Sequence, residues 1–191
     1  SHELRTPISA MIGFSEVLIG DDSLTSSQKE SVDYILKSGH RLLNVVSDIL
    51  KISVIEAGKV KFDYSDFDIK NLIEDIIVLE KKQLVNDDVS IKVKVNGLSR
   101  IYSDQSRIRI ILLNLIGNAV KFTVKGEIKI HVYSKNNYYF FEVKDTGIGI
   151  DENDKEIIFD LFRQAEKAIR RKYQGTGLGL TISKRLVEAL G

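Results

Sequence analysis

Residues 114–123 have the sequence NLIGNAVKFT, and two glycine-rich segments follow them, DTGIGI at 145–150 and GTGLGL at 175–180. The first segment continues an apolar helical pattern, the second ends a strand pattern, and the third opens another helix. Asparagines on a helix beside two glycine-rich turns predict a nucleotide pocket, because phosphates are bound by backbone N–H groups and a flat base needs close backbone approach. Far upstream, SHELRTP at 1–7 supplies a histidine that can accept the phosphate.

Asn114 and Asn118 are four residues apart, so both amides project from one face of the predicted helix. Amide oxygens suit Mg²⁺, which keeps several waters and binds substrate phosphates in preference to a cage of protein ligands. Lys121 lies one turn further and can reach a phosphate. Local hydrogen bonding is the alternative role for the two amides, but two asparagines on an otherwise apolar face favour a metal and nucleotide site.

The two glycine-rich segments differ in the chemistry that they offer. Asp145 ends a strand pattern, where its carboxylate can accept a hydrogen bond from an exocyclic amine such as that of adenine. Gly147 and Gly149 then let the backbone approach a flat ring closely. The later segment directly precedes a helix, so its N–H groups and the helix dipole are available to a polyphosphate. Read alone, the earlier segment also fits a tight turn and the later one a flexible hinge, and neither is a dinucleotide fingerprint or a Walker A loop.

The segment 163–174, between the two glycine-rich segments, is strongly basic. It contains a single glutamate, Glu166, against Arg163, Lys167, Arg170, Arg171 and Lys172. A mobile basic segment over phosphates would act as a lid. A solvated surface explains the same charges equally well, so the sequence leaves both interpretations open.

Composition excludes several classes of function. The 191 residues are 43% apolar, and 28 Lys and Arg residues balance 27 Asp and Glu residues, so no charge bias favours nucleic acid or a membrane surface. The absence of cysteine excludes disulfides, thiolate metal sites and a cysteine nucleophile. No apolar run reaches the roughly 18 residues of a membrane span.

Apolar periodicity predicts the secondary structure. We expect helices at residues 2–20, 28–57, 68–85, 105–122 and 177–190, and strands at 60–64, 89–95, 127–134 and 138–144. Because helices and strands mix without regular alternation, the prediction is an α+β sandwich with helices on one face of a mostly antiparallel sheet. Gly58 ends the second helix and separates a hairpin domain, 1–57, from a second domain, 58–191.

The apolar stripe of the second helix is wide enough to need neighbours on several sides, as in a four-helix bundle, so we expect a homodimer. At about 1.5 Å per residue the first helix reaches roughly 28 Å and the second roughly 45 Å, which puts His2 opposite Val46. The apolar residues beyond that point are expected to have no partner in this sequence, so we expect the first helix to be cut short. These residues are Ile49, Leu50, Ile52 and Ile55.

His2 is the candidate phosphate acceptor. Its imidazole is largely neutral at pH 7 and keeps a lone pair for attack, and adjacent Glu3 can orient the ring or accept its proton. Pro7 lacks an N–H, so inside a helix it would free the Glu3 carbonyl and bend the helix beside His2. In the alternative arrangement, Thr6 is an N-cap with Pro7 at the first helical position, and His2 lies in a frayed tail.

The chain resembles the catalytic core of two-component sensor histidine kinases over essentially its whole length. SHELRTP is similar to the phosphoacceptor box, which implies His2 as acceptor, Glu3 as base or orienter and Thr6 as a residue that places water in phosphatase action. NLIGNAVKFT is similar to the N box, DTGIGI to the first glycine box, FDLFRQ to the F box and GTGLGL to the second glycine box. These boxes imply Mg-ATP binding by Asn114, Asn118, Lys121, Phe122, Asp145, Gly147, Gly149, Phe159, Phe162, Gly175, Thr176, Gly177, Leu178 and Gly179.

The resemblance also implies partners and location. His2 would receive phosphate from ATP and pass it to an aspartate of a response-regulator receiver domain docked on the hairpin. The homodimer forms through the hairpin, no nucleic acid is bound, and the core lies in the cytoplasm, anchored to the membrane through segments absent from this chain. Two other functions stay open, a phosphatase-dominant regulator and a non-catalytic dimerisation or docking module, and the sequence does not decide between transfer in cis and in trans.

Three departures from the family pattern are expected to matter. The family's first helix begins well before the acceptor, and its ATP-binding domain adds two strands after the helix that ends here at Gly191. We therefore expect both domains to be truncated and the sheet to lack an edge. Gln174 stands where many members have a further glycine, which affects the predicted lid.

Overall fold

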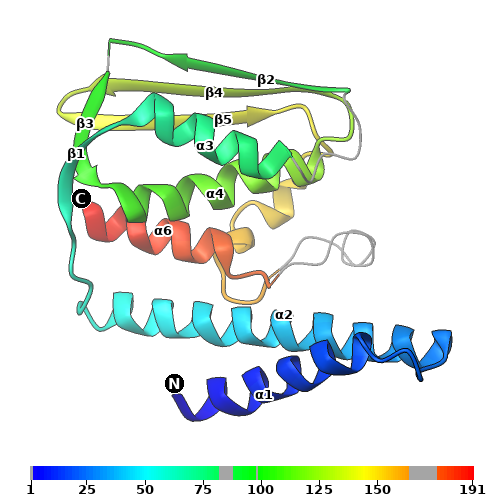
Figure 1. The fold of residues 1–191 in the computed structure, drawn as a ribbon. Coiled ribbons are helices and arrows are strands. Elements are labelled where there is room, and N and C mark those ends of the chain that lie inside the picture. The colour runs from blue at the N-terminus through cyan, green and yellow to red at the C-terminus, as the bar shows by residue number, and fades with distance from the viewer. Residues whose placement is uncertain (1, 82–87, 98, 164–175) are drawn as a thin grey trace.

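The computed structural model describes residues 2–81, 88–97, 99–163 and 176–191, arranged as a helical hairpin below a layer of helices and a sheet (Figure 1). The helices are α1 (His2–Ile19), α2 (Ser26–Glu56), α3 (Ile69–Lys81), α4 (Gln105–Phe122), α6 (Gly179–Leu190) and the short 3₁₀ turns η1 (Glu152–Asp154) and η2 (Ile157–Phe159). The strands are β1 (Tyr64–Asp68), β2 (Val89–Val95), β3 (Arg100–Asp104), β4 (Gly126–Lys135) and β5 (Tyr138–Asp145). None of the described helices is long and apolar enough to cross a bilayer.

Local sequence signals explain the hairpin formed by α1 and α2. α2 starts with a capping box, in which the Thr25 hydroxyl accepts from the Gln28 N–H and the Gln28 side chain accepts from the Thr25 N–H. Where the helices cross, Ile12 lies so close to buried Gly39 that a Cβ on this glycine would come within 2.9 Å of the Ile12 Cγ1. The small residue therefore sets how closely the two helices approach.

The sheet explains why the helices gather on one side. β4 pairs in parallel with β2 and antiparallel with β5, and β1 and β3 form a separate antiparallel pair. Along β4, Ile128, Ile130 and Val132 face the helices and are at most 1% exposed, whereas the alternate residues face outward. α3 and α4 cover the inner face, so the predicted α+β sandwich with helices on one face is confirmed (Figure 1).

Two details of the predicted strands are wrong, because β3 was not expected and β1 begins at Tyr64 and not at Val60. The pairing is mostly antiparallel, as expected, and only the β2–β4 pair among the described strands is parallel. β1 and β3 hold each other by backbone pairing that brings Phe67 opposite Ile101, a contact between distant segments. Pairing of this kind is fixed by tertiary packing, which a local pattern does not contain.

The C-terminal half of α2 packs against α6, and this corrects the expectation that Ile52 and Ile55 have no partner. Ile52 is 4% exposed and belongs to the same apolar core as Ile182 and Leu186 of α6, and Ile55 packs against that core. Glu56 and Arg185 form an ion pair at the edge, with the Oε1 and Nη2 atoms 3.6 Å apart. α2 thus runs between α1 and the helical layer, and one of its faces belongs to the second domain (Figure 1).

Candidate nucleotide and phosphoacceptor site

Asn114 joins the N box to the second glycine box. Its Nδ2 donates to the Gly179 carbonyl at 3.0 Å and to the Ser183 hydroxyl at 3.1 Å, so the amide ties the middle of α4 to the first turn of α6. A Cβ on Gly179 would lie 2.9 Å from the Asn114 Oδ1, and therefore only glycine fits there without a shift. Sequence analysis had placed Asn114 at the metal; here its NH₂ group is committed to α6, and Ser183 is a partner that the motifs did not reveal.

Asn118 and Lys121 lie further along α4. Asn118 is half-buried, and within the described ranges its amide makes no hydrogen bond. Burial lowers the pKa of the Lys121 ammonium below its ordinary value, and the positive charge of Arg41 on α2 lowers this pKa further. The Lys121 Nζ also lies over the Phe122 ring, 5.2 Å from its centroid. Lys121 of the second domain and Arg41 of the hairpin therefore interact electrostatically at the end of α4.

The first glycine-rich segment wraps around the C-terminal end of α4. Asp145 ends β5, and its Oδ1 accepts from the Gly147 N–H at 2.9 Å, which closes a tight turn. The Phe122 carbonyl accepts from the Ile148 N–H at 3.3 Å, and a Cβ on Gly147 would come within 2.5 Å of this carbonyl oxygen. Gly149 has a φ of 71°, which favours glycine. DTGIGI is therefore a tight turn, and the same glycines let its backbone pack closely against a neighbouring segment.

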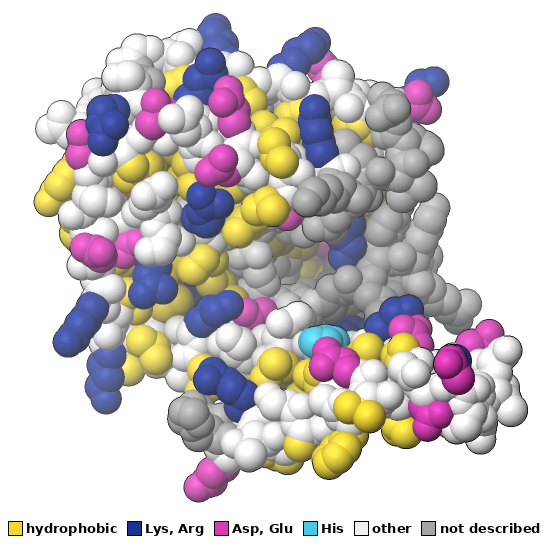
Figure 2. Space-filling model, viewed as in Figure 1, with side chains coloured by type: hydrophobic (Ala, Val, Ile, Leu, Met, Phe, Trp, Pro, Cys, Tyr) yellow, Lys and Arg dark blue, Asp and Glu magenta, His cyan; other side chains and the backbone are white. Residues whose placement is uncertain are grey.

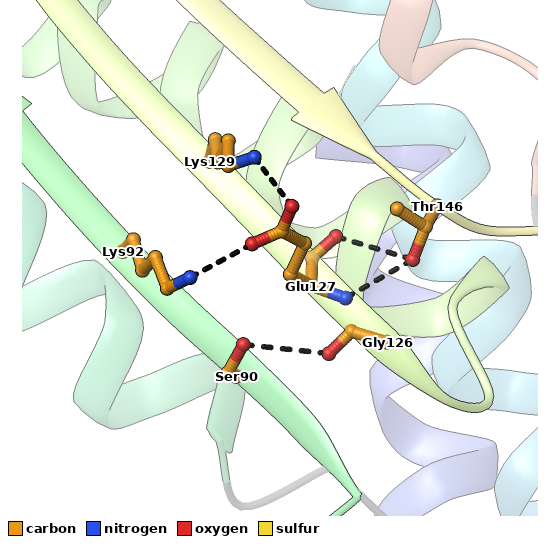
Figure 3. Close-up of polar contacts among 6 residues, drawn as sticks. All are labelled: Ser90, Lys92, Gly126, Glu127, Lys129 and Thr146. Carbon is orange, nitrogen blue, oxygen red and sulfur yellow. Dashed lines mark hydrogen bonds and ion pairs between the residues drawn. The ribbon is translucent and has the colours of Figure 1, made fainter.

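Thr146 anchors this turn to the sheet, and sequence analysis missed it. Its hydroxyl accepts from the Glu127 N–H at 3.0 Å and donates to the Glu127 carbonyl at 3.4 Å (Figure 3). The Thr146 N–H also donates to this carbonyl, at 3.2 Å. The Glu127 carboxylate points away from Thr146, toward Lys92 and Lys129, and Gly126 leaves room for the threonine side chain (Figure 3). The sequence signal that could have revealed this role is the threonine inside the glycine-rich segment DTGIGI.

The second glycine-rich segment is described from Thr176 onward, and Gly175 lies outside the described residues. The Thr176 hydroxyl accepts from the Leu178 N–H at 3.3 Å, Gly177 has a φ of 71°, and Leu178 is fully buried. Among the described residues, no side chain caps the N-terminus of α6, whose N-cap residue is Leu178. Uncapped N–H groups at a helix start attract phosphate.

The F-box phenylalanines have different environments. The Phe159 carbonyl accepts from the Thr181 hydroxyl at 2.7 Å, and the Lys184 Nζ lies 5.6 Å from the centre of the Phe159 ring, so η2 is fixed to α6. Phe162 is 54% exposed and has a φ of 61°. The basic segment predicted as a lid lies outside the described residues from position 164 onward, with Gln174 in it.

The acceptor box belongs to α1. The helix begins at His2 and continues through Pro7, so the arrangement with Thr6 as N-cap and His2 in a frayed tail is wrong. Glu3 and Thr6 are exposed. α2 runs between the N-terminal turn of α1 and the start of α6, so the acceptor segment and the glycine-rich segments lie on opposite sides of α2 (Figure 1).

The predicted Mg²⁺ would be bound by asparagine amides and nucleotide phosphates, and not by a cage of carboxylates or imidazoles. Among the described residues, no group of three or more His, Cys, Asp or Glu side chains is placed to hold a metal ion. The unengaged Asn118 amide and the uncapped start of α6 fit an ion that binds mainly through nucleotide phosphates.

Comparison with known families gives two domain matches in the chain. Residues 1–58 match the His Kinase A (phospho-acceptor) domain, and residues 103–191 match the histidine kinase-, DNA gyrase B- and HSP90-like ATPase domain. The second match includes the N box and both glycine boxes.

Curated relatives and solved structures agree with these domains. All of the chain matches the circadian input-output histidine kinase CikA of Synechococcus elongatus (39% identity, 26% of that protein) and the histidine-protein kinase BarA of Escherichia coli (35%, 22%). The chain therefore spans about a quarter of the length of these relatives. The crystal structure of full-length ShkA in complex with AMPPNP matches with a TM-score of 0.83 and 32% identity, over 98% of this chain and 39% of that one. The chain belongs to the sensor histidine kinases of two-component systems.

Proposed function

We propose that the chain is an ATP-dependent protein-histidine kinase that phosphorylates His2 and then relays the phosphoryl group to an aspartate of a response-regulator receiver domain. The observation that carries this proposal is the convergence of three separate motif segments on one helix, α4. Asn114 of α4 bonds to Gly179, and Gly147 approaches the Phe122 carbonyl at the end of α4, so both glycine boxes contact the N-box helix. The acceptor box opens a helix of the neighbouring hairpin.

The nucleotide would lie between α4, the Asp145 turn and the start of α6. The free carboxylate oxygen of Asp145 would accept a hydrogen bond from the adenine amine, because Gly147 occupies the other oxygen. The uncapped N–H groups of α6 and the Lys121 ammonium would bind phosphates. Mg²⁺ would be held by Asn118 and the phosphates and would neutralise their charge.

At the acceptor, an imidazole nitrogen of neutral His2 attacks the γ-phosphorus, the bond to the bridging oxygen breaks, and ADP leaves. Glu3, the next residue in the sequence, would accept the proton that the ring loses. Positioning and charge neutralisation supply most of the acceleration in such transfers. Because α2 lies between the acceptor turn and α6, transfer within one chain requires the ATP-binding domain to move along or away from α2 (Figure 1).

A homodimer would cover the outer surface of the hairpin. Figure 2 shows apolar side chains along the exposed face of the hairpin. Large apolar side chains of α1 and α2 with high exposure include Phe14 at 74%, Val17 at 73% and Tyr34 at 73%. An apolar surface of this kind on paired helices favours a four-helix bundle. The receiver domain would dock on the same bundle near His2. Location in the cytoplasm and attachment to a membrane remain predictions from the family resemblance.

Incubation with γ-labelled ATP tests the proposal. The chain is expected to take up label that is stable in base and labile in acid, as a phosphohistidine is. His2→Gln removes the label, whereas His40→Gln, which changes an exposed histidine of the same hairpin, keeps it. Asn118→Ala reduces both the label and Mg-dependent ATP binding. Label that persists on His2→Gln would exclude His2 as the acceptor.

A further inference from the structure

Arg41 lies on the face of α2 that is turned away from α1. Gly39 faces α1, because a Cβ on this glycine would come within 2.9 Å of the Ile12 Cγ1. Arg41 follows two residues later, and at about 100° per residue it projects from nearly the opposite side of the helix. The Arg41 side chain is exposed, so a ligand can reach it.

The same face of α2 packs against the ATP-binding domain further along the helix. Ile52 is buried in the core that contains Ile182 of α6, and Val45 is half-buried against that core. Arg41 comes one turn before Val45 and about three turns before Ile52, and at 3.6 residues per turn these positions share one side of the helix. The Arg41 side chain is therefore directed toward the ATP-binding domain.

α2 extends past the start of α6, and Arg41 lies on this extension. The two helices run in the same direction, and α6 begins at Gly179, less than one turn before Ile182 (Figure 1). At about 1.5 Å per residue, Arg41 is roughly 16 Å from Ile52 along α2, whereas Gly179 is only about 5 Å from Ile182 along α6. Arg41 therefore lies beyond the N-terminus of α6, in the direction in which the N–H groups of its first turn point.

Lys121 brings a second positive charge to this region from the end of α4. Burial lowers the pKa of the Lys121 ammonium, and the charge of Arg41 lowers this pKa further, so the two cations are close enough to repel each other. An anion between them is attracted by both. The positive end of the α6 dipole adds to this attraction. Three sources of positive potential, from α2, α4 and α6, thus surround the space in which the phosphates of the nucleotide would lie.

We propose that Arg41 belongs to the phosphate site, and that its guanidinium donates to the terminal phosphate of a nucleoside triphosphate while the ATP-binding domain is docked on α2. The triphosphate then contacts both domains, with Lys121 and the start of α6 on one side and Arg41 on the other. A diphosphate lacks the group that Arg41 binds, so ATP favours the docked arrangement more than ADP does. This inference rests on the proposed function, because it adds a residue of the hairpin to the nucleotide site.

Calorimetric titration with Mg-AMPPNP and with Mg-ADP tests the contact without phosphoryl transfer. Arg41→Gln should weaken AMPPNP about tenfold, the equivalent of one charge-assisted hydrogen bond, and should change ADP by less than about twofold. Arg41→Lys keeps the charge and should recover part of the loss. Lys37→Gln, a change of an exposed lysine one turn earlier on α2, is the matched control and should leave both affinities unaltered.

The two nucleotides separate a phosphate contact from a structural role. An Arg41→Gln variant that binds AMPPNP as tightly as the wild type, or that loses AMPPNP and ADP equally, overturns the assignment of Arg41 and leaves the proposed function standing. A wild type that binds neither nucleotide means that the proposed function has failed at its nucleotide site, and the assignment of Arg41 fails with it. Circular dichroism of each variant checks that the fold is kept.

Cross-linking tests whether the triphosphate holds the two domains together. Glu56→Cys with Arg185→Cys places one cysteine on each side of the contact between α2 and α6, where the native side chains meet at 3.6 Å. Because coupling between sites is reciprocal, Mg-AMPPNP should speed cross-linking by a bis-maleimide severalfold relative to Mg-ADP, and Arg41→Gln should abolish this difference. A cross-linking rate that is equal with the two nucleotides in the presence of Arg41 overturns the bridging.

Discussion

Thr146 supports the proposed nucleotide pocket from outside, through the backbone of Glu127. Thr146→Val keeps the shape of the side chain but removes the acceptor, so the Glu127 N–H loses its partner and the turn that carries Asp145 loosens. We expect ATP affinity to fall about tenfold, the equivalent of one neutral hydrogen bond. Thr146→Ser should restore it. Calorimetric titration with ATP and Mg²⁺ measures both, and an unaltered affinity in Thr146→Val would show that the turn does not depend on this hydroxyl.

Asp104 links acid stability to the start of the N-box helix. It is 1% exposed, and although burial alone would raise the pKa of this carboxyl, hydrogen bonds from the Asp63 and Arg107 N–H groups and from Ser106 hold the pKa below its ordinary value of 3.8. A lowered folded-state pKa stabilises the fold at every pH above the ordinary value, and this stabilisation is lost as pH falls through the folded-state pKa.

Asp104→Asn should therefore lower the free energy of unfolding by about 1–2 kcal/mol at neutral pH. The difference from the wild type should shrink below pH 3.8, the ordinary value for this side chain. Urea unfolding across this pH range measures it, with Asp88→Asn at an exposed position as the matched control. A difference that is constant with pH would mean that the charge of Asp104 is not what stabilises the helix.

At the scale of elements, alanine substitution at two glycines of the hairpin distinguishes the effect of helix propensity from the effect of side-chain packing. Alanine in place of a helical glycine stabilises by about 0.5–1 kcal/mol. A Cβ on Gly13 meets no atom within 4 Å, whereas one on Gly39 meets the buried Ile12 side chain at 2.9 Å. We expect Gly13→Ala to stabilise the chain and Gly39→Ala to destabilise it by about 1–3 kcal/mol, the usual cost of overpacking. Thermal unfolding followed by circular dichroism tests this, and equal effects would mean that α1 and α2 are further apart than described.

Local signals in the sequence predicted the elements that they control and missed those held by distant partners. α4 and β2 begin and end where the pattern predicted, since apolar periodicity and polar ends agree there. β3 has only Ile101 and Ser103 as buried alternating positions before its final aspartate, and its partner lies far back in the chain. Asn114 was found from its spacing, but its bonds to Gly179 and Ser183 depend on how α4 meets α6.

At the scale of the whole molecule, the sequence predicts that the helices of a dimeric four-helix bundle cover the apolar stripe of α2. The structure divides that stripe, because Ile52 is buried against α6 whereas Ile49 remains 40% exposed. Periodicity measures how much apolar surface a helix has, but it does not say which partner covers each part. The same helix therefore serves the proposed dimer on one side and the ATP-binding domain on the other.

The contact between α2 and α6 makes domain movement testable by cross-linking. The chain has no cysteine, so Glu56→Cys with Arg185→Cys gives one pair that a reducible bis-maleimide can join across the two domains, where the native side chains meet at 3.6 Å. The cross-link should leave ATP binding intact and should lower His2 labelling at least about tenfold, because the acceptor and the glycine-rich segments are then held on opposite sides of α2 (Figure 1). Reduction of the linker should restore the rate.

Asp66→Cys with Arg100→Cys, a pair between β1 and β3 inside one domain, is the matched control and should label normally when cross-linked. Full labelling of the locked chain would mean that phosphoryl transfer does not require α6 to leave α2.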